Sequence, residues 1–172
     1  MSSLFTYKRT KWIYNIKDTY IEFIRAYDNR VADNKNESRP YIGIILLIGD
    51  VKYYAPFTSP KPKHRRMHND KDFRKIDGGR LGAINFNNMI PVPDEAIIPL
   101  RISNEQNPQY RRLLQNQYNA ILSDWELIQN TAETLHSLLF MPEAELSRRD
   151  RSVKSRCCNL PLLESVYNNW QP

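Results

Sequence analysis

Two apolar segments joined by a two-residue turn constrain the fold of this chain more than any other feature. Tyr41–Leu47 and Val51–Phe57 are rich in β-branched and aromatic side chains, which favour strands. Gly49-Asp50 lies between them, and glycine readily adopts the positive φ that a short hairpin turn needs. The pattern therefore predicts an antiparallel β-hairpin in the first third of the chain.

The rest of the chain divides into a strand-rich first half and a helical second half. Shorter strands are expected at residues 12–16, 81–86 and 89–92, and the charged stretch 60–80 is expected to form a long mobile loop. This segregation predicts an α+β fold, in which a small curved sheet or barrel carries helices. The 172 residues suffice for a single domain, with residues 1–11 as a polar extension.

Helix starts are marked by capping residues. Asp18 is expected to cap an early helix, and Asn107 followed by proline predicts the start of a long one. Ser123-x-x-Glu126 resembles a capping box that opens the next helix. Apolar residues between 162 and 170 predict a C-terminal helix.

The net charge of +6 favours a polyanionic partner, and the cations are clustered. The first basic run is Lys61, Lys63, Arg65, Arg66, Lys71, Arg74 and Lys75, with His64 and His68, and the second is Arg148, Arg149, Arg151, Lys154 and Arg156. Both are candidates for contacts with an RNA backbone. The two histidines are expected at the surface, where they would help bind phosphate. The alternative is that both runs are only a solvated face.

Other classes of site and compartment are disfavoured. Cys157 and Cys158 are adjacent, so two reduced, buried thiols in a cytosolic protein are expected rather than a disulfide. No spacing of cysteine, histidine or carboxylate residues predicts a metal site, and no cofactor is expected. The polar N-terminus is not a signal peptide, and the longest apolar run is too short to span a membrane. A cytoplasmic protein is therefore expected.

The end of the second hairpin strand carries groups suited to phosphodiester chemistry. Thr58, Ser59 and Lys61 lie within four positions, and a two-residue turn places Arg39 near their register. Metal-free RNA cleavage requires groups that position a phosphate and neutralise its charge, which hydroxyls and cations provide. The alternative is that Thr-Ser-Pro-Lys is simply a turn, since serine and proline are typical turn residues.

Several segments in the same order resemble the ToxN/AbiQ family, the endoribonuclease toxins of type III toxin–antitoxin systems. The resemblance covers roughly residues 12–170. It is carried by Pro40-Tyr41-Ile42-Gly43-Ile44, by Tyr54-Ala55-Pro56-Phe57-Thr58-Ser59-Pro60-Lys61, and by Leu81-Gly82-Ala83-Ile84-Asn85. It implies a compact, MazF/Kid-like antiparallel β-barrel elaborated with helices.

The resemblance also implies an activity and its partners. It implies metal-independent cleavage of RNA that leaves a 2′,3′-cyclic phosphate. The implied antitoxin is itself a repeat RNA, which the toxin cuts into pseudoknotted units that then inhibit it, commonly in a closed toxin–RNA ring. The other implied partner is target mRNA, with neither DNA nor a membrane, and the implied role is phage defence by abortive infection.

Some site residues follow from the resemblance. The Thr-Ser-x-Lys motif of the family falls on Thr58, Ser59 and Lys61, and a further basic position falls on Arg39. Arginine stays protonated, so its role is expected to be electrostatic. A tyrosine that contributes in some members has no clear match here, and Tyr41 or a histidine is a candidate for its role.

Two alternatives remain open at this stage. One is a ribonuclease toxin with a protein antitoxin, and the other is an RNA-binding module without catalysis. Tandem repeats in the DNA upstream of the gene separate the first alternative from a type III toxin. Incubation with RNA in EDTA separates the second, because a binder leaves the RNA intact.

Overall fold

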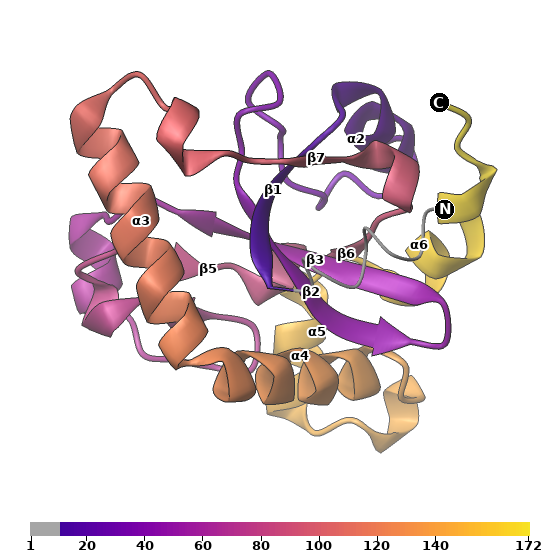
Figure 1. The fold of residues 1–172 in the computed structure, drawn as a ribbon. Coiled ribbons are helices and arrows are strands. Elements are labelled where there is room, and N and C mark those ends of the chain that lie inside the picture. Colours follow the sequence, from indigo (N-terminus) through magenta and orange to yellow (C-terminus); the bar gives the residue numbers. More distant parts are fainter. Residues whose placement is uncertain (1–10) are drawn as a thin grey trace.

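The computed structural model describes residues 11–172, so the predicted polar extension lies, apart from Lys11, outside the described residues. The predicted hairpin is confirmed and forms the centre of the sheet (Figure 1). Strand β2 (Tyr41–Ile48) pairs antiparallel with β3 (Val51–Thr58), and Ile48 lies opposite Val51. Gly49 adopts φ +58°, so Gly49-Asp50 is the expected two-residue turn.

The sheet is antiparallel throughout and open. Its order is β4-β5-β3-β2-β1-β7, and β6 also pairs with β3. The other strands are β1 (Trp12–Ile16), β4 (Arg74–Lys75), β5 (Ala83–Ile84), β6 (Ile90–Pro91) and β7 (Ile97–Pro99). Within the described residues β4 and β7 pair on one side only, so the closed barrel expected from the sequence is not confirmed. The α+β class is confirmed.

The segment after β3 is more ordered than the sequence suggests. Residues 60–80 form two short 3₁₀ helices, η1 (Pro62–Arg65) and η2 (Asp77–Gly79), on either side of β4. Phe73 and Ile76 are buried, which anchors this segment in the protein interior. The long loop predicted here therefore contains short regular elements and is anchored by buried side chains. The strands expected at 81–86 and 89–92 shrink to two residues each, because the 3₁₀ helix η3 (Phe86–Asn88) separates them.

The described part of the chain has five α-helices packed around the sheet: α2 (Asp18–Arg25), α3 (Pro108–Ser123), α4 (Trp125–Leu139), α5 (Arg148–Arg156) and α6 (Leu160–Val166). Asn107 caps α3 as predicted, since its Oδ1 accepts hydrogen bonds from the backbone N–H groups of Gln109 and Tyr110. The predicted capping box at Ser123 is wrong. The Ser123 hydroxyl donates instead to the carbonyl of Asn119, and α4 begins only at Trp125.

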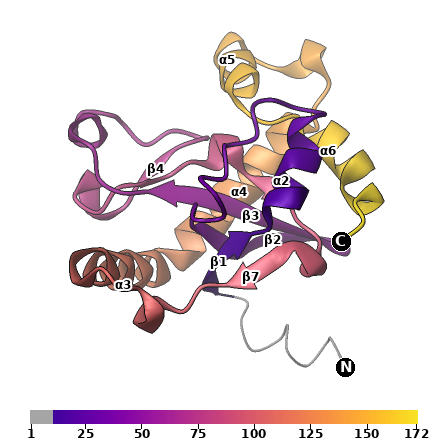
Figure 2. The same cartoon turned by 90° about the horizontal axis from the view of Figure 1, so that it is seen from above.

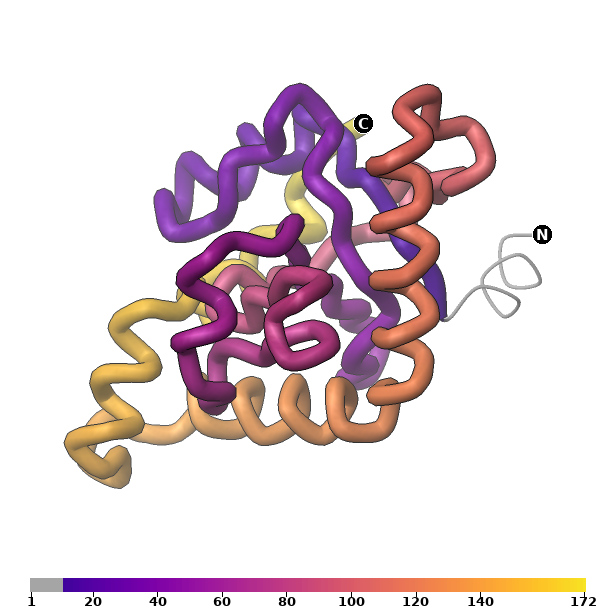
Figure 3. The backbone as a smooth tube through the Cα atoms, turned by 90° about the vertical axis from the view of Figure 1, so that its left-hand side faces the viewer, coloured from indigo at the N-terminus to yellow at the C-terminus, as the bar shows by residue number. Residues whose placement is uncertain are grey.

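Helix α3 lies on one side of the sheet, and α2 and α6 lie on the opposite side (Figures 1 and 2). In Figure 3 the segment that follows β3 lies in the space bordered by α3 and α4, with α5 beyond it. The core contains several large side chains with no more than 1% exposure, among them Tyr20, Tyr53 and Phe57. Cys157 and Cys158 are free and buried, as predicted, and burial raises the pKa of both thiols to about 12. Between residues 11 and 172 no helix is long and apolar enough to cross a membrane.

Candidate functional site

The C-terminal end of β3 is held in place from three sides. Thr58 pairs with Ala83 of β5, and the buried amide of Gln117 on α3 donates to the carbonyl oxygens of Thr58 (3.2 Å) and Leu81 (2.8 Å). Gly82 adopts φ +104°, and a Cβ at this position would lie only 1.8 Å from the Thr58 carbonyl oxygen. Only glycine fits here, so the backbone that carries Thr58 and Ser59 has a fixed position.

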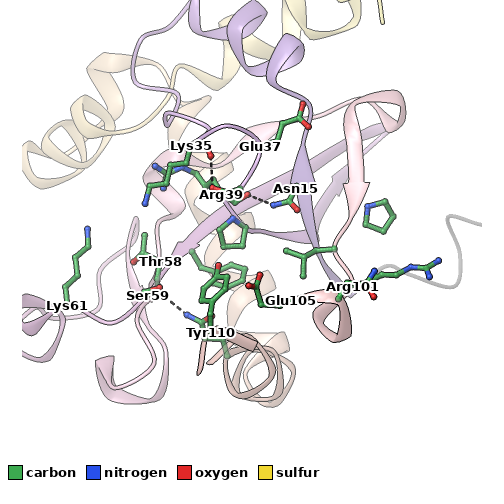
Figure 4. A pocket seen from close by; sticks show the side chains of 17 residues that line it. Asn15, Lys35, Glu37, Arg39, Thr58, Ser59, Lys61, Arg101, Glu105 and Tyr110 are labelled. Atoms are coloured by element: carbon green, nitrogen blue, oxygen red, sulfur yellow. Dashed lines mark hydrogen bonds between the residues drawn. The ribbon is translucent and has the colours of Figure 1, made fainter. Parts of the chain in front are cut away.

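A cleft of about 580 Å³ opens at this end of β3. Arg39, Thr58, Ser59 and Lys61 all line it, so the structure brings together the four side chains predicted as catalytic. In Figure 4 the two hydroxyl residues lie between Arg39 and Tyr110, and the Lys61 side chain extends to one side of them. We call this the first cleft.

The strand register explains why Arg39 is part of this cleft. Tyr41 pairs with Pro56, and the N–H of Phe57 donates to the carbonyl of Pro40 at 3.2 Å, so the two strands remain joined up to the open end of the hairpin. Asn15 of β1 donates to the Arg39 carbonyl at 3.2 Å. The Arg39 guanidinium donates through Nε to the carbonyl of Asp33. The guanidinium is thus held through Nε, and its other donors have no partner within residues 11–172.

Lys35 is a cation of the first cleft that the sequence analysis missed. It begins a turn in which three consecutive non-glycine residues, 35 to 37, have φ between 49° and 62°. Such left-handed residues are unfavourable unless their surroundings fix them. Here the backbone N–H of Asp18 donates to the Glu37 carboxylate at 2.9 Å. The backbone N–H of Glu37 donates in turn to the Asp18 carboxylate at 3.0 Å. The buried Asn34 amide also binds Asp18, at 2.7 Å. The polar composition of residues 32–38 predicts a loop, but it does not predict these three left-handed conformations.

His64 is a correction to the sequence analysis. It was expected at the surface, but it is only 3% exposed. Its Nδ1 accepts a hydrogen bond from the backbone N–H of Lys61 at 3.1 Å, and the backbone N–H of His64 donates to the Lys61 carbonyl at 2.9 Å. Burial, and then the nearby cations Lys63 and Lys61, lower the pKa of the imidazole. His64 therefore fixes the turn that presents Lys61.

Tyr41 is a second correction. Its side chain is 0% exposed and packs in the core, so it is not available to stack on a base or contact a phosphate. The expected substitution of Tyr41 for the missing tyrosine of the motif is therefore contradicted. Tyr110 on α3 is the tyrosine that lines the first cleft, and nothing in its helical spacing distinguished it from a packing residue.

The cations of the two basic runs have two kinds of environment. Lys63, Arg65, Arg66 and His68 are exposed in the segment that follows Lys61. Five other predicted RNA contacts form ion pairs with carboxylates: Lys71 with Asp150, Arg74 with Asp124, Arg149 with Asp70, Lys154 with Glu143, and Arg156 with Asp72. Several of these pairs join the segment after β3 to α5. They therefore serve at least partly to attach that segment, which the sequence analysis did not anticipate.

A second cleft, of about 350 Å³, shares Thr58 and Lys61 with the first. Its other walls include Asn85 and Asn87. Thr58 Oγ1 is buried and has no hydrogen-bond partner among the described residues. A buried hydroxyl of this kind usually has a partner, which makes Thr58 Oγ1 an exception within residues 11–172. Within residues 11–172 no group of three or more histidine, cysteine or carboxylate side chains is placed to hold a metal ion.

Comparison with known protein families identifies one match over most of the chain. The family described as toxin ToxN of the type III toxin–antitoxin system matches residues 12–168. The endoribonuclease ToxN of Bacillus thuringiensis subsp. kurstaki is 29% identical over 170 residues, covering 96% of this chain and 87% of the relative. The endoribonuclease ToxN of Pectobacterium atrosepticum is 29% identical, covering 91% and 92%. The endoribonuclease AbiQ of Lactococcus lactis subsp. lactis is 29% identical, covering 79% and 81%.

Solved structures share the fold. One, which reports selective toxin inhibition by a non-coding RNA pseudoknot in bacterial type III systems, matches with a TM-score of 0.82 and 27% identity, covering 93% of this chain and 97% of that one. Another, in which a processed non-coding RNA regulates a bacterial antiviral system, matches with a TM-score of 0.75 and 28% identity over 94% and 99%. AbiQ, a lactococcal anti-phage endoribonuclease, has a TM-score of 0.76 at 23% identity over 93% and 97%, and supports the fold alone.

Proposed function

This chain belongs to the ToxN family of type III toxin–antitoxin toxins, and from this premise we propose that it is an endoribonuclease whose active site is the first cleft. The observation that carries the proposal is the convergence of Arg39, Thr58, Ser59 and Lys61 at the end of β3. Two hydroxyls and two cations at a rigid strand end are suited to binding one phosphodiester group and stabilising its charge.

The proposed reaction is transesterification within the RNA. The 2′-hydroxyl loses its proton and attacks the adjacent phosphorus, while the bond from phosphorus to the 5′-oxygen breaks. The departing 5′-oxygen takes up a proton. The products are a 2′,3′-cyclic phosphate and a 5′-hydroxyl, and no step requires a metal ion.

Each residue has a proposed role in this reaction. Lys61 stabilises the charge that builds up on the phosphate oxygens and is the candidate proton carrier. Ser59 positions the phosphate or relays a proton, and Thr58 supports it at the same strand end. Arg39 acts electrostatically, because a guanidinium does not release its proton in a protein.

We propose that the inhibitor of this toxin is an RNA. A solved relative is inhibited by a non-coding RNA pseudoknot. Here the exposed cations Lys63, Arg65 and Arg66 follow the active-site lysine directly, where they would contact an RNA backbone. The antitoxin would be a repeat RNA that the toxin cuts into pseudoknotted units, which then occlude the cleft in a closed toxin–RNA ring. The released toxin would cleave cellular mRNA and so arrest growth during phage infection.

The proposal is tested by incubating the purified protein with RNA in EDTA and determining the product ends. We expect cleavage that leaves 5′-hydroxyl ends. Lys61→Ala and Ser59→Ala should each reduce the rate about a hundredfold to a thousandfold, the usual effect of losing one preorganised contact to a developing charge. Lys52→Ala is the matched control, because Lys52 lies at the other end of β3 and pairs with Asp94.

Four results would contradict the proposal. Intact RNA with the wild-type protein would mean a binding module. Full dependence on magnesium, or 5′-phosphate ends, would mean a different mechanism. Full activity of both variants would place the active site elsewhere. The DNA upstream of the gene tests the antitoxin separately: tandem repeats support an RNA antitoxin, whereas a gene for a small acidic protein contradicts it.

A further inference from the structure

We infer that the second cleft is a specificity pocket, which binds one unstacked nucleobase next to the cleaved phosphate and reads its edge through Asn85 and Asn87. This inference rests on the proposed ribonuclease function and adds the residues that would select the cleavage sequence. The two asparagines are not among the four residues assigned to the reaction, although the cleft they line adjoins two of those residues.

The location of the second cleft is the first argument. It meets the first cleft at Thr58 and Lys61, the residues assigned to the phosphate. An RNA strand whose reacting phosphate lies there must place one neighbouring nucleotide on each side. The two clefts therefore provide one space for each side of the cleaved bond.

The state of the two asparagines is the second argument. Their backbones are fixed: the N–H of Asn85 donates to the carbonyl of Pro56 (2.9 Å), and the N–H of Asn87 donates to the carbonyl of Asp72 (3.0 Å). Their side-chain amides nevertheless make no hydrogen bond within residues 11–172. Asn85 even precedes η3 at the N-cap position without capping it. By contrast, the neighbouring Asn88 is used structurally, since its amide donates to the Arg30 carbonyl at 2.8 Å.

The chemistry of the amide group is the third argument. An asparagine side chain offers a donor and an acceptor side by side, and this pair matches base edges that present the complementary pair. Proteins recognise RNA sequence chiefly on unstacked bases in single-stranded segments, by hydrogen bonds to those edges. Two half-buried, unpartnered amides on a rigid backbone can therefore discriminate between bases without a large entropic cost.

The remaining wall supports the same role. Arg156 binds Asp72 through two hydrogen bonds of 2.9 and 3.0 Å, which fixes its guanidinium beside the cleft. Lys63 and the exposed His68 also line this cleft, where they would bind the flanking phosphates. The second cleft thus combines fixed hydrogen-bonding groups with cations at its border, as a nucleotide site requires.

The test is cleavage of a random-sequence RNA pool followed by sequencing of the cut ends. For the wild-type protein we expect a base preference at one position next to the cut. Asn85→Ala and Asn87→Ala should reduce that preference by about 5- to 150-fold for each lost base-edge pair while cleavage of other sequences continues. Asn85→Asp and Asn87→Asp keep the shape but replace the donor with an acceptor, and should change which base is preferred. Asn116→Ala, an exposed asparagine on α3, should leave the profile unchanged.

The outcomes separate this inference from the proposed function. If the wild-type protein cleaves no RNA, the proposed function fails. If it cleaves and the asparagine variants show the wild-type base profile, only the specificity pocket is refuted. A uniformly lower rate with an unchanged profile also refutes it, because that result indicates a structural role. If either alanine variant no longer shows the circular dichroism spectrum of the folded protein, the base preference of the aspartate variants decides whether the specificity pocket is supported or refuted.

Discussion

Replacing Gly82 by alanine should disrupt the strand end that carries the proposed active site. Gly82 has φ +104°, and an added Cβ would meet the carbonyl oxygen of Thr58 at 1.8 Å. Real Cβ atoms essentially never approach closer than 3.0 Å, so one backbone must move by more than an ångström. The backbone that moves is that of Thr58 and Ser59, or that of the β5 segment paired with it.

The size of the effect follows from two contributions. An alanine held in this sparsely populated region of φ costs about 2 kcal/mol. Forcing a methyl group into a packed site adds about 2 kcal/mol. The total loss in the free energy of unfolding is therefore about 4 kcal/mol, which for a domain of this size lowers the melting temperature by about 12 °C.

Gly78→Ala is the matched control. Gly78 also has a positive φ, of +62°, but an added Cβ would have no neighbour within 4 Å. Only the conformational cost remains, about 1.5 kcal/mol, or about 4 °C in melting temperature. The comparison therefore separates the backbone strain that both variants share from the collision at Thr58.

The assay has a stability arm and an activity arm. Urea denaturation and thermal melting measure the loss in the free energy of unfolding for each variant. RNA cleavage is followed at a temperature where both variants are folded. Gly82→Ala should cleave about a hundredfold more slowly, because a displacement of about 1 Å misplaces the reacting groups. Gly78→Ala should retain the wild-type rate. Equal losses of stability in the two variants, or full activity of folded Gly82→Ala, would refute the reasoning.

Three further predictions follow from the site. Replacing all three exposed cations Lys63, Arg65 and Arg66 by alanine should reduce the slope of log K against log salt for RNA binding by about 2, at ~0.7 per phosphate contact. Arg149→Ala removes one ion-paired cation and should therefore reduce this slope by less than ~0.7. Stability should fall as the pH drops below about 6.5, because burial and then nearby lysines lower the pKa of His64 and the unfolded chain takes up the proton first. In His64→Gln this part of the pH dependence of the urea midpoint should disappear, and an unchanged profile would contradict the assignment. Gln117→Leu should lower the free energy of unfolding by about 2–6 kcal/mol, since it leaves two carbonyl oxygens without their donor, and a wild-type urea midpoint would show that they find other partners.

Local patterns in the sequence determined the hairpin and the long helix. Gly49-Asp50 and the apolar segments on either side specify a register through interactions between near neighbours. Asn107 specifies the start of α3 in the same way, through bonds to residues two and three positions later. Because the hairpin register is local, the meeting of Arg39 with Thr58, Ser59 and Lys61 also followed from the sequence. The segments around this hairpin resemble one family closely enough that the sequence alone identified the family to which the chain belongs.

The tertiary structure alone decided which polar groups are available. Whether a histidine or a tyrosine is exposed depends on what distant segments place over it, and His64 and Tyr41 prove to be buried. Whether a cation is free depends on acids far away in the chain, as Arg156 and Asp72 show across 84 positions. The second cleft likewise forms only because Pro56, Asp72 and Cys158 bind the backbone of the segment that carries Asn85 and Asn87. These contacts are made by long-range packing, which no local pattern of residues encodes.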